Sequence, residues 1–366
     1  MKILILTNHD LGLYKFRREL LETLVKDNEV FVSLPIGKFT EDIKNIGCKY
    51  IETSFDRKGT SIFNDLKLFY TYINIIKETH PNIVLTYTIK PNVYGGLACQ
   101  MLGIPYIVNV TGLGSAIENG GLLSFVSTFL YKLGLRKANK VFFQNEDNMK
   151  YMLEKGIGKN NSDMIPGSGV NLKQYMPYEF PNDDSIEFTY VGRIMKEKGF
   201  DQYIEAAKYI RNKYKNTKFH VCGPYEDDYK QLIDELVEMG VIVYDGYVED
   251  MTEIYKKVQC TIHPTYYPEG LSNALLETCA CGRSIITTNR AGCKEVVENG
   301  YNGYIVKQKD NNDLISKIEM FLSLTNTERK QMGLNARKKV EKEFDRNIVI
   351  NKYIQAINEA TTNGKE

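Results

Sequence analysis

Residues 260–282 read CTIHPTYYPEGLSNALLETCACG, and this stretch decides the fold. Its first residues are apolar and form a run short enough for a buried strand, which a proline ends. Ser272 or Asn273 is a natural N-cap, and the Ala-Leu-Leu-Glu that follows favours a helix, which the last glycine ends. We therefore expect a strand, a loop that carries Glu269, and a helix that carries Glu277 inside its first two turns.

Such a helix start suits a phosphate, because its backbone amides are unpaired and carry a partial positive charge. Glu269 at the lip of the loop can accept hydrogen bonds from sugar hydroxyls, and Glu277 can accept both hydroxyls of a ribose. Two acids beside a phosphate site repel the ligand unless cations are supplied, and Arg193 and Lys198 are candidates. Alone, the two glutamates fit an ordinary surface helix equally well.

The composition is that of a soluble globular chain. With 366 residues, 43% hydrophobic and 25% charged, it exceeds what one core usually organises, so two domains are expected. A formal charge of +1 argues against a nucleic-acid partner. Seven cysteines without a paired framework, and no signal peptide, favour a reduced cytoplasmic protein. Cys279, Cys281 and Cys293 do not have the spacing of a zinc site, so no metal is expected.

Strand-like and helical runs alternate along the chain, which predicts an α/β fold with parallel sheets. The predicted strands of the first half are Lys2–Thr7, Glu29–Leu34, Lys49–Thr53, Ile83–Tyr87, Tyr106–Val110, Lys140–Gln144 and Met164–Pro166. Residues 8–13 are expected to form a loop and Ile62–Lys77 a long helix. After a linker of turn-forming residues near 176–184, the alternation starts again.

The predicted strands of the second half are Ile186–Val191, Phe219–Cys222, Val241–Tyr244, Cys260–Pro264, Ser284–Thr288 and Tyr304–Val306. Its last predicted helices are Asn312–Leu322, Thr327–Val340 and Arg346–Ala360. We expect a first domain at 1–180, a second domain at 181–345, and a final helix at 346–366 that packs back on the first domain. Two doubly wound domains that face each other would place the ligands in a cleft at the carboxyl ends of their strands.

Residues 191–199 follow a strand and open a helix. Gly192 lets the backbone turn, so that Arg193 and Lys198 can reach the same edge as the helix start near 272. A guanidinium and an ammonium can share the charge of a diphosphate. A solvated basic turn is the alternative if this segment is considered alone.

The pattern Gly-Arg-x4-Lys-Gly at 192–199, followed by Glu-x7-Glu at 269–277, resembles the retaining glycosyltransferases of family 4. This resemblance implies the two-domain GT-B fold and no metal, since the two cations can take a metal's electrostatic role and no Asp-x-Asp occurs in a plausible loop. It implies that Arg193 and Lys198 hold the donor diphosphate, that Glu269 contacts the donor sugar, and that Glu277 contacts the ribose. The remaining donor contacts that it implies are the backbone of Gly270, Leu271 and Ser272 at the phosphates, and the Tyr247-Val248 loop at the nucleobase.

The first half is similar to a narrower group, which extends oligosaccharides on polyprenyl-diphosphate carriers. The runs that carry this resemblance are 56–60, 87–95 and 109–114. It makes Lys90, Arg57 and Lys58 the expected partners of the acceptor's diphosphate. Ordinary surface cations are the alternative for each.

One departure from the family concerns the loop after the fifth strand, residues 109–112, which lacks the histidine of many members. His9, after the first strand, is the substitute candidate, although a loop histidine without a catalytic role fits as well. Gly12 would allow this loop to approach the donor phosphates. No catalytic base is assigned. In retaining members the departing phosphate oxygen can accept the acceptor's proton, so positioning and leaving-group stabilisation carry the rate.

The segment 122–137 is apolar on most faces and ends in cations. It fits either a helix that lies on an anionic leaflet or a buried crossover helix with a basic last turn. Phe16, Arg17 and Arg18 can add to the same membrane surface.

The sequence therefore predicts a retaining glycosyltransferase that moves a hexose or N-acetylhexosamine from a UDP-sugar to a polyprenyl-diphosphate-linked sugar. We expect it in the cytoplasm, peripherally bound to the inner face of the cell membrane. A UDP-sugar epimerase of the same fold, or an inactive binding subunit, are the alternatives.

Overall fold

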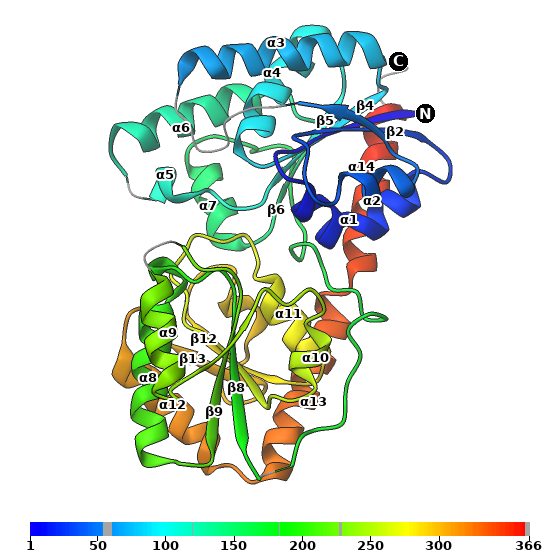
Figure 1. Cartoon of the computed structure of the whole chain (residues 1–366). Coiled ribbons are helices and arrows are strands. Elements are labelled where there is room, and N and C mark those ends of the chain that lie inside the picture. Colours follow the sequence, from blue (N-terminus) through cyan, green and yellow to red (C-terminus); the bar gives the residue numbers. More distant parts are fainter. Residues whose placement is uncertain (54–60, 119, 183, 227–228, 363–366) are drawn as a thin grey trace. The chain divides into compact units, whose positions relative to one another are not determined.

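The structure is a computed structural model that describes residues 1–53, 61–118, 120–182, 184–226 and 229–362. The chain divides into two units (Figure 1). The first unit comprises Met1–Ser168, Glu269–Leu271 and Asn347–Glu366. The second comprises Gly169–Pro268 and Ser272–Arg346.

The first unit contains a seven-stranded parallel sheet in the order β3-β2-β1-β4-β5-β6-β7. Its strands are β1 (Lys2–Leu6), β2 (Glu29–Leu34), β3 (Lys49–Glu52), β4 (Ile83–Tyr87), β5 (Tyr106–Val110), β6 (Lys140–Phe143) and β7 (Ser162–Met164). The first six strands begin where predicted, and three of them, β1, β3 and β6, end one residue earlier than predicted. The last, β7, lies two residues before its predicted position. The strand order reverses direction between β1 and β4, which is where ligands bind in doubly wound sheets.

Helices cover both faces of this sheet, which is why its central strands are buried along their whole length. The helices of the first unit are α1 (Asp10–Leu24), α2 (Thr40–Asn45), α3 (Ile62–Thr79), η1 (Pro91–Gly95), α4 (Gly96–Leu102), α5 (Ser115–Glu118), α6 (Gly121–Gly134), α7 (Glu146–Glu154) and α14 (Arg346–Thr362). One core joins the sheet to α1 and α14, with Leu20 and Tyr353 among its residues. The other core joins the opposite face to α3, η1, α4 and α6, with Tyr72 and Tyr131 among its residues (Figure 1).

Arg17 lies in the first of these cores, so the prediction that it belongs to a membrane surface is wrong. Its guanidinium is buried and donates to the carbonyl of Gly167 at 3.3 and 3.4 Å. It also lies over the rings of Tyr87 and Tyr353, at 5.6 and 5.7 Å. Cation–π contacts and a carbonyl partner thus hold the charge inside the unit.

The second unit contains a six-stranded parallel sheet in the order β10-β9-β8-β11-β12-β13. Its strands are β8 (Ile186–Val191), β9 (Thr217–Cys222), β10 (Val243–Gly246), β11 (Cys260–His263), β12 (Ser284–Thr288) and β13 (Gly303–Val306). The predicted strand at Val241–Tyr244 starts two residues too early. The amides of Val241 and Ile242 donate to the carbonyl of Leu236, so these apolar residues close the preceding helix and do not pair with β9.

The helices of the second unit are η2 (Lys196–Lys198), α8 (Phe200–Lys213), α9 (Lys230–Glu238), α10 (Thr252–Tyr255), α11 (Asn273–Ala280), η4 (Lys294–Val296), α12 (Asn311–Ser323) and α13 (Asn326–Glu343). Figure 1 shows α8, α9 and α12 on one side of the sheet and α10, α11 and α13 on the other. The predicted linker packs against this unit through Arg283, which is fully buried and donates to the carbonyls of Tyr255 at 2.6 Å and Glu179 at 2.7 Å. Burial lowers the pKa of Arg283 to about 10.

A buried histidine joins two carboxylates across β8, β9 and β10. His220 Nδ1 lies 2.9 Å from Asp245 Oδ2, and its Nε2 lies 3.0 Å from Glu187 Oε2. Burial by itself lowers the pKa of His220, but the hydrogen bonds with Asp245 and Glu187 raise it, to about 9. The same hydrogen bond from His220 is the main reason that the pKa of Glu187 falls to about 2. The ring is therefore protonated at neutral pH and bridges the three strands.

We expect His220→Gln to destabilise the protein more at about pH 6 than at about pH 10. The folded-state pKa of about 9 lies above the ordinary 6.5. The charged ring therefore contributes its full stabilisation when the pH is below the ordinary pKa of 6.5. This stabilisation is lost as the pH rises through the folded-state pKa of about 9. At the lower pH, the free energy of unfolding of the variant should be about 2–3 kcal/mol below that of the wild type. Urea unfolding of the full chain measures it, with the exposed His80→Gln as control; an equal loss at both pH values would contradict the assignment.

Candidate active site

The site predicted for the donor lies at the carboxyl edge of the second sheet. β8 pairs with β9 on one side and with β11 on the other, so the direction of the strand order reverses at β8. The loops after β8 and β11 therefore open next to each other, at the place where doubly wound sheets bind ligands. Arg193 and Lys198 follow β8, and Ser272 follows β11.

The two predicted cations share one aromatic ring. The guanidinium carbon of Arg193 lies 5.5 Å from the ring centre of Tyr267, and Lys198 Nζ lies 5.0 Å from the same centre. The ring attracts both charges, but the charges repel each other, so an anion beside them is favoured. Arg193 also pairs with Glu226 at 3.3 Å, in a contact that is exposed to solvent and therefore weak. The structure thus brings Arg193 and Lys198 together, as predicted.

Short contacts hold the loops after β8 and β11 against each other. Gly199 has φ 76°, and a Cβ there would lie 2.1 Å from the carbonyl oxygen of Pro264. No other residue allows this approach. The amide of Tyr266 donates to the carbonyl of Glu197 at 2.9 Å. These contacts fix the position of Tyr267, whose ring lies beside Arg193 and Lys198.

Ser272 is the N-cap residue of α11. Its amide donates to the carbonyl of Gly292 at 2.8 Å, and its hydroxyl lies 3.3 Å from His263 Nε2. The hydroxyl makes no capping hydrogen bond to the first turn of α11. The hydroxyl of Ser272 therefore does not occupy the first backbone amides of α11. These amides can bind an anion that lies next to Arg193 and Lys198.

Glu277 lies one turn inside α11, beside Tyr175. Burial raises the pKa of the Tyr175 hydroxyl, and the charge of Glu277 and a hydrogen bond to it raise this pKa further. Tyr175 therefore stays a neutral donor to the carboxylate. Glu277 is half-buried.

Glu269, Gly270 and Leu271 belong to the first unit. The side chain of Asn145, the N-cap of α7, donates to the carbonyl of Gly270 at 2.6 Å and to that of Glu269 at 3.1 Å. A Cβ on Gly270 would lie 2.3 Å from both Gln144 Oε1 and the carbonyl oxygen of Thr111. The predicted roles of this segment toward the donor stay predictions.

The segment predicted as a loop after β1 is shorter than expected, because α1 begins at Asp10. His9 is the N-cap of α1, and its Nδ1 accepts from the amide of Gly12 at 3.3 Å. Gly12 thus lies in the first turn of the helix, so the prediction that it belongs to a loop is wrong. The cap compensates for the poor helix propensity of glycine at this point.

Lys90, predicted to bind the acceptor's diphosphate, follows β4 at the strand-order reversal of the first sheet. Its Nζ lies 2.7 Å from Asp65 Oδ1 of α3, and Asp65 Oδ2 accepts from the Tyr94 hydroxyl at 2.8 Å. Burial, and then the hydrogen bond to Asp65, raise the pKa of Tyr94. Thr88, just before, has φ 71°, which is strained for a β-branched residue and typical of functional sites. The two further predicted cations, Arg57 and Lys58, lie outside the described residues.

Val248, predicted to lie near the nucleobase, follows β10. It is half-buried and packs against a small cluster that contains Cys222, Met251 and Ile254. Its predicted role also stays a prediction.

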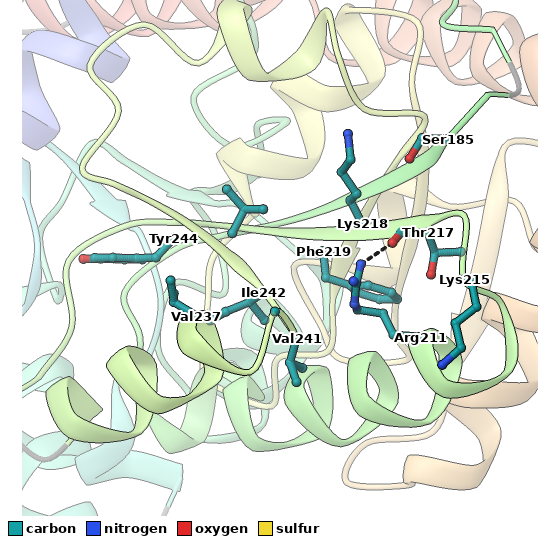
Figure 2. A pocket seen from close by; sticks show the side chains of 12 residues that line it. Ser185, Arg211, Lys215, Thr217, Lys218, Phe219, Val237, Val241, Ile242 and Tyr244 are labelled. Carbon is teal, nitrogen blue, oxygen red and sulfur yellow. Dashed lines mark hydrogen bonds between the residues drawn. The ribbon is translucent and has the colours of Figure 1, made fainter.

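A hollow of about 530 Å³ lies at the other end of the second sheet (Figure 2). The starts of β9 and β10 and the ends of α8 and α9 form it. Two of the three cations that line it have partners within the protein: Arg211 donates to the carbonyl of Thr217, and Lys218 pairs with Glu187 at 2.7 Å. Because it is at the amino ends of the strands, this hollow is not part of the candidate site.

The side chains that sequence reasoning missed are the partners of the predicted cations: Tyr267 under Arg193 and Lys198, and Asp65 beside Lys90. Tyr267 had a signal, since it lies in the loop after a strand that ends at the ligand-binding edge. Asp65 had none, because it lies on a helix far from Lys90 in the sequence.

Among the described residues, no group of three or more His, Cys, Asp or Glu side chains is arranged to hold a metal. All seven cysteines are buried. None of the described helices has the length and apolar character needed to cross a bilayer.

Comparison with known proteins agrees with this architecture. Anabaena HepE, solved in complex with UDP, superposes with a TM-score of 0.79 at 16% identity, covering 97% of this chain and 98% of that one. Two doubly wound parallel sheets with this likeness define a protein of the GT-B fold. Residues 2–145 match the family described as Glycosyl transferase 4-like, and residues 174–339 match Glycosyl transferases group 1. The chain belongs to these glycosyltransferases.

Two relatives are similar over much of the chain. The N,N'-diacetylbacillosaminyl-diphospho-undecaprenol alpha-1,3-N-acetylgalactosaminyltransferase of Campylobacter jejuni is 28% identical over 376 residues, which cover 97% of this chain and 98% of the relative. The UDP-Gal:alpha-D-GlcNAc-diphosphoundecaprenol alpha-1,3-galactosyltransferase of Escherichia coli is 24% identical over 279 residues, which cover 71% of each.

Proposed function

We infer that this glycosyltransferase moves a hexose or N-acetylhexosamine from a UDP-sugar to a sugar carried on polyprenyl diphosphate, in the assembly of a cell-surface glycan. The observation that carries the inference is the pair of cations, Arg193 and Lys198, over the ring of Tyr267 at the strand-order reversal of the second sheet. A diphosphate is the anion that such a pair fits. The diphospho-undecaprenol acceptors in the names of both relatives support the acceptor class.

In this proposal the donor is bound by the residues after β8 and β11. Arg193 and Lys198 hold the diphosphate, and the backbone at Ser272 and the start of α11 adds amide donors. Glu277 accepts the ribose hydroxyls, and Glu269 accepts those of the donor sugar. The proposed donor contacts also include the backbone of Gly270 and Leu271 at the phosphates and Val248 at the base.

The reaction proceeds with retention of configuration at the donor C1. The bond from C1 to the departing phosphate oxygen breaks, and a bond from C1 to the acceptor hydroxyl oxygen forms on the same face. The acceptor's proton passes to the departing phosphate oxygen, so no protein base is needed. Arg193 and Lys198 stabilise the charge that grows on the leaving UDP.

The acceptor's diphosphate is bound by Lys90, which Asp65 and Tyr94 hold in place, together with Arg57 and Lys58. His9 contributes a ring nitrogen near the acceptor. Because the carrier is a lipid, the enzyme works while bound peripherally to the inner face of the cell membrane.

The experiment is a panel of nucleotide sugars, with UDP release measured with and without a polyprenyl-diphosphate-linked sugar and against a detergent blank. We expect UDP release with one UDP-sugar only when acceptor is present, and an α-linked product from an α-linked donor. Conversion of the donor sugar without acceptor would contradict transfer and favour an epimerase. Inversion at C1 would contradict the retaining mechanism.

A further inference from the structure

Helix α6 presents its apolar side to solvent. Leu122 is 79% exposed and Phe125 71%, and Val126 and Phe129 are exposed as well. These side chains lie on one stripe of the helix, at the spacing that normally faces a core. The pattern is therefore the reverse of that of an ordinary surface helix. Of the two alternatives for residues 122–137, the buried crossover helix is wrong for this apolar stripe.

The opposite side of α6 packs on the protein through small and polar residues. Ser124 donates to the carbonyl of Ile117 at 2.8 Å. At Gly134 a Cβ would lie 2.7 Å from Val93 Cα, so the helix touches the backbone of η1 directly. Only Tyr131 among its large side chains is fully buried. Leu130 also packs against the core, whereas Leu122, Leu123, Phe125 and Phe129 are left exposed for another partner.

Helix α3 repeats this arrangement at its first turns. Ile62 and Leu66 lie one turn apart on the helix surface, at positions i and i+4. Ile73 is buried in the core, but Ile62 is 78% exposed. Phe63 and Tyr70 are exposed beside them. α3, α4 and α6 all cover the same face of the first sheet (Figure 1), and Met101 of α4 is exposed too.

The charges of α6 and of the residues just after it have one sign. Lys132, Arg136 and Lys137 are exposed at the end of α6, and no Asp or Glu occurs from 121 to 137. Exposed apolar side chains with cations at the rim are complementary to an anionic bilayer, where the apolar groups enter the acyl region and the cations meet the lipid phosphates. At 14 residues α6 is too short to span, so it would lie in the plane of the interface.

The same surface leads to the acceptor site. Asp65 lies in the first turn of α3, between Phe63 and Leu66, and it holds Lys90 at 2.7 Å. If this turn of α3 meets a bilayer, Lys90 would lie near the lipid headgroups, which is where the diphosphate of a lipid carrier lies.

We propose that the exposed faces of α3 and α6 form a docking surface for an anionic lipid bilayer, which brings the lipid carrier's diphosphate to Lys90. The link to the carrier rests on the proposed function, but docking itself does not. The surface is that of Ile62, Phe63, Leu66, Leu122, Phe125, Val126 and Phe129.

The experiment is cosedimentation of the full chain with vesicles of phosphatidylcholine alone or mixed with phosphatidylglycerol. We expect binding to the mixed vesicles that falls about tenfold or more in Phe125→Ser and in Phe63→Ser, since each removes a large apolar side chain from the interface. Met239→Ser, which removes an equally exposed apolar side chain from the second unit, should bind as the wild type does. Arg136→Gln with Lys137→Gln should weaken binding to the mixed vesicles only.

Wild-type binding by Phe125→Ser would overturn the proposal. So would a concentration-dependent dimer in sedimentation velocity that this variant abolishes while vesicles bind neither protein, because the surface would then be covered by a second copy. Transfer to a water-soluble short-chain acceptor is measured separately with the wild type. Its absence, with vesicle binding as expected, would contradict the proposed function and leave the docking surface standing.

Discussion

Replacing Lys198 with alanine is expected to lower kcat by about a hundredfold to a thousandfold, and Arg193→Ala to do the same. Each cation stabilises the negative charge that grows on the diphosphate as the bond to the sugar breaks. Their shared place over Tyr267, at 5.0 and 5.5 Å, keeps both beside the same leaving group. The loss should therefore fall mainly on kcat, because the leaving group carries more charge in the transition state than in the bound donor.

Steady-state kinetics with saturating acceptor measure this effect. Lys309→Ala is a matched control, because Lys309 lies 4.5 Å from the ring centre of the neighbouring Tyr266 and has no proposed role. Arg193→Lys should retain part of the activity, since it keeps the charge but loses the planar fork. A kcat within a few-fold of wild type in both alanine variants, about what the control shows, would remove these cations from the leaving-group site.

The sheets could be predicted from the sequence because their strands are short, buried and separated by helices. β8, at Ile186–Val191, agrees with its prediction at both ends. The errors have local causes. Val241 and Ile242 are as apolar as a strand, but their amides close helix α9 after Gly240, which has φ 65° and marks the end of that helix. Gly12 suggested a loop, and the ring of His9 allows a helix to begin before it.

The candidate site was predictable only in part, because a motif names residues but not their partners. Arg193 and Lys198 were predicted together from their spacing, and the structure adds the ring that gathers them. Lys90 was predicted as an acceptor cation, but its ion pair with Asp65 joins residues that are distant in the sequence. Long-range pairs of this kind arise from the topology, which places the start of α3 beside the carboxyl end of β4.

The carboxylate of Glu277 has the second large expected effect. We expect Glu277→Gln to weaken UDP binding about 10-fold to 100-fold, the range for losing charge-assisted hydrogen bonds to the two ribose hydroxyls. The amide keeps the size of the side chain, so the fold of α11 should not change. Because Tyr175 donates to this carboxylate, Tyr175→Phe should also weaken UDP binding, but only by about threefold to tenfold. This variant loses the hydrogen bond that orients the carboxylate, but it keeps the carboxylate that accepts from the ribose.

Calorimetric titration with UDP, in the absence of any acceptor, isolates this effect from catalysis. Glu298→Gln is the control: Glu298 is an exposed carboxylate of the same unit, and its ion pair with Lys339 lies at 3.1 Å. Glu277 and the two cations then make separable contributions, because loss of the carboxylate should appear in UDP affinity and loss of a cation in kcat. Unchanged UDP affinity in a correctly folded Glu277→Gln would place the ribose elsewhere, and a fall in kcat alone would assign Glu277 to the reacting sugar instead.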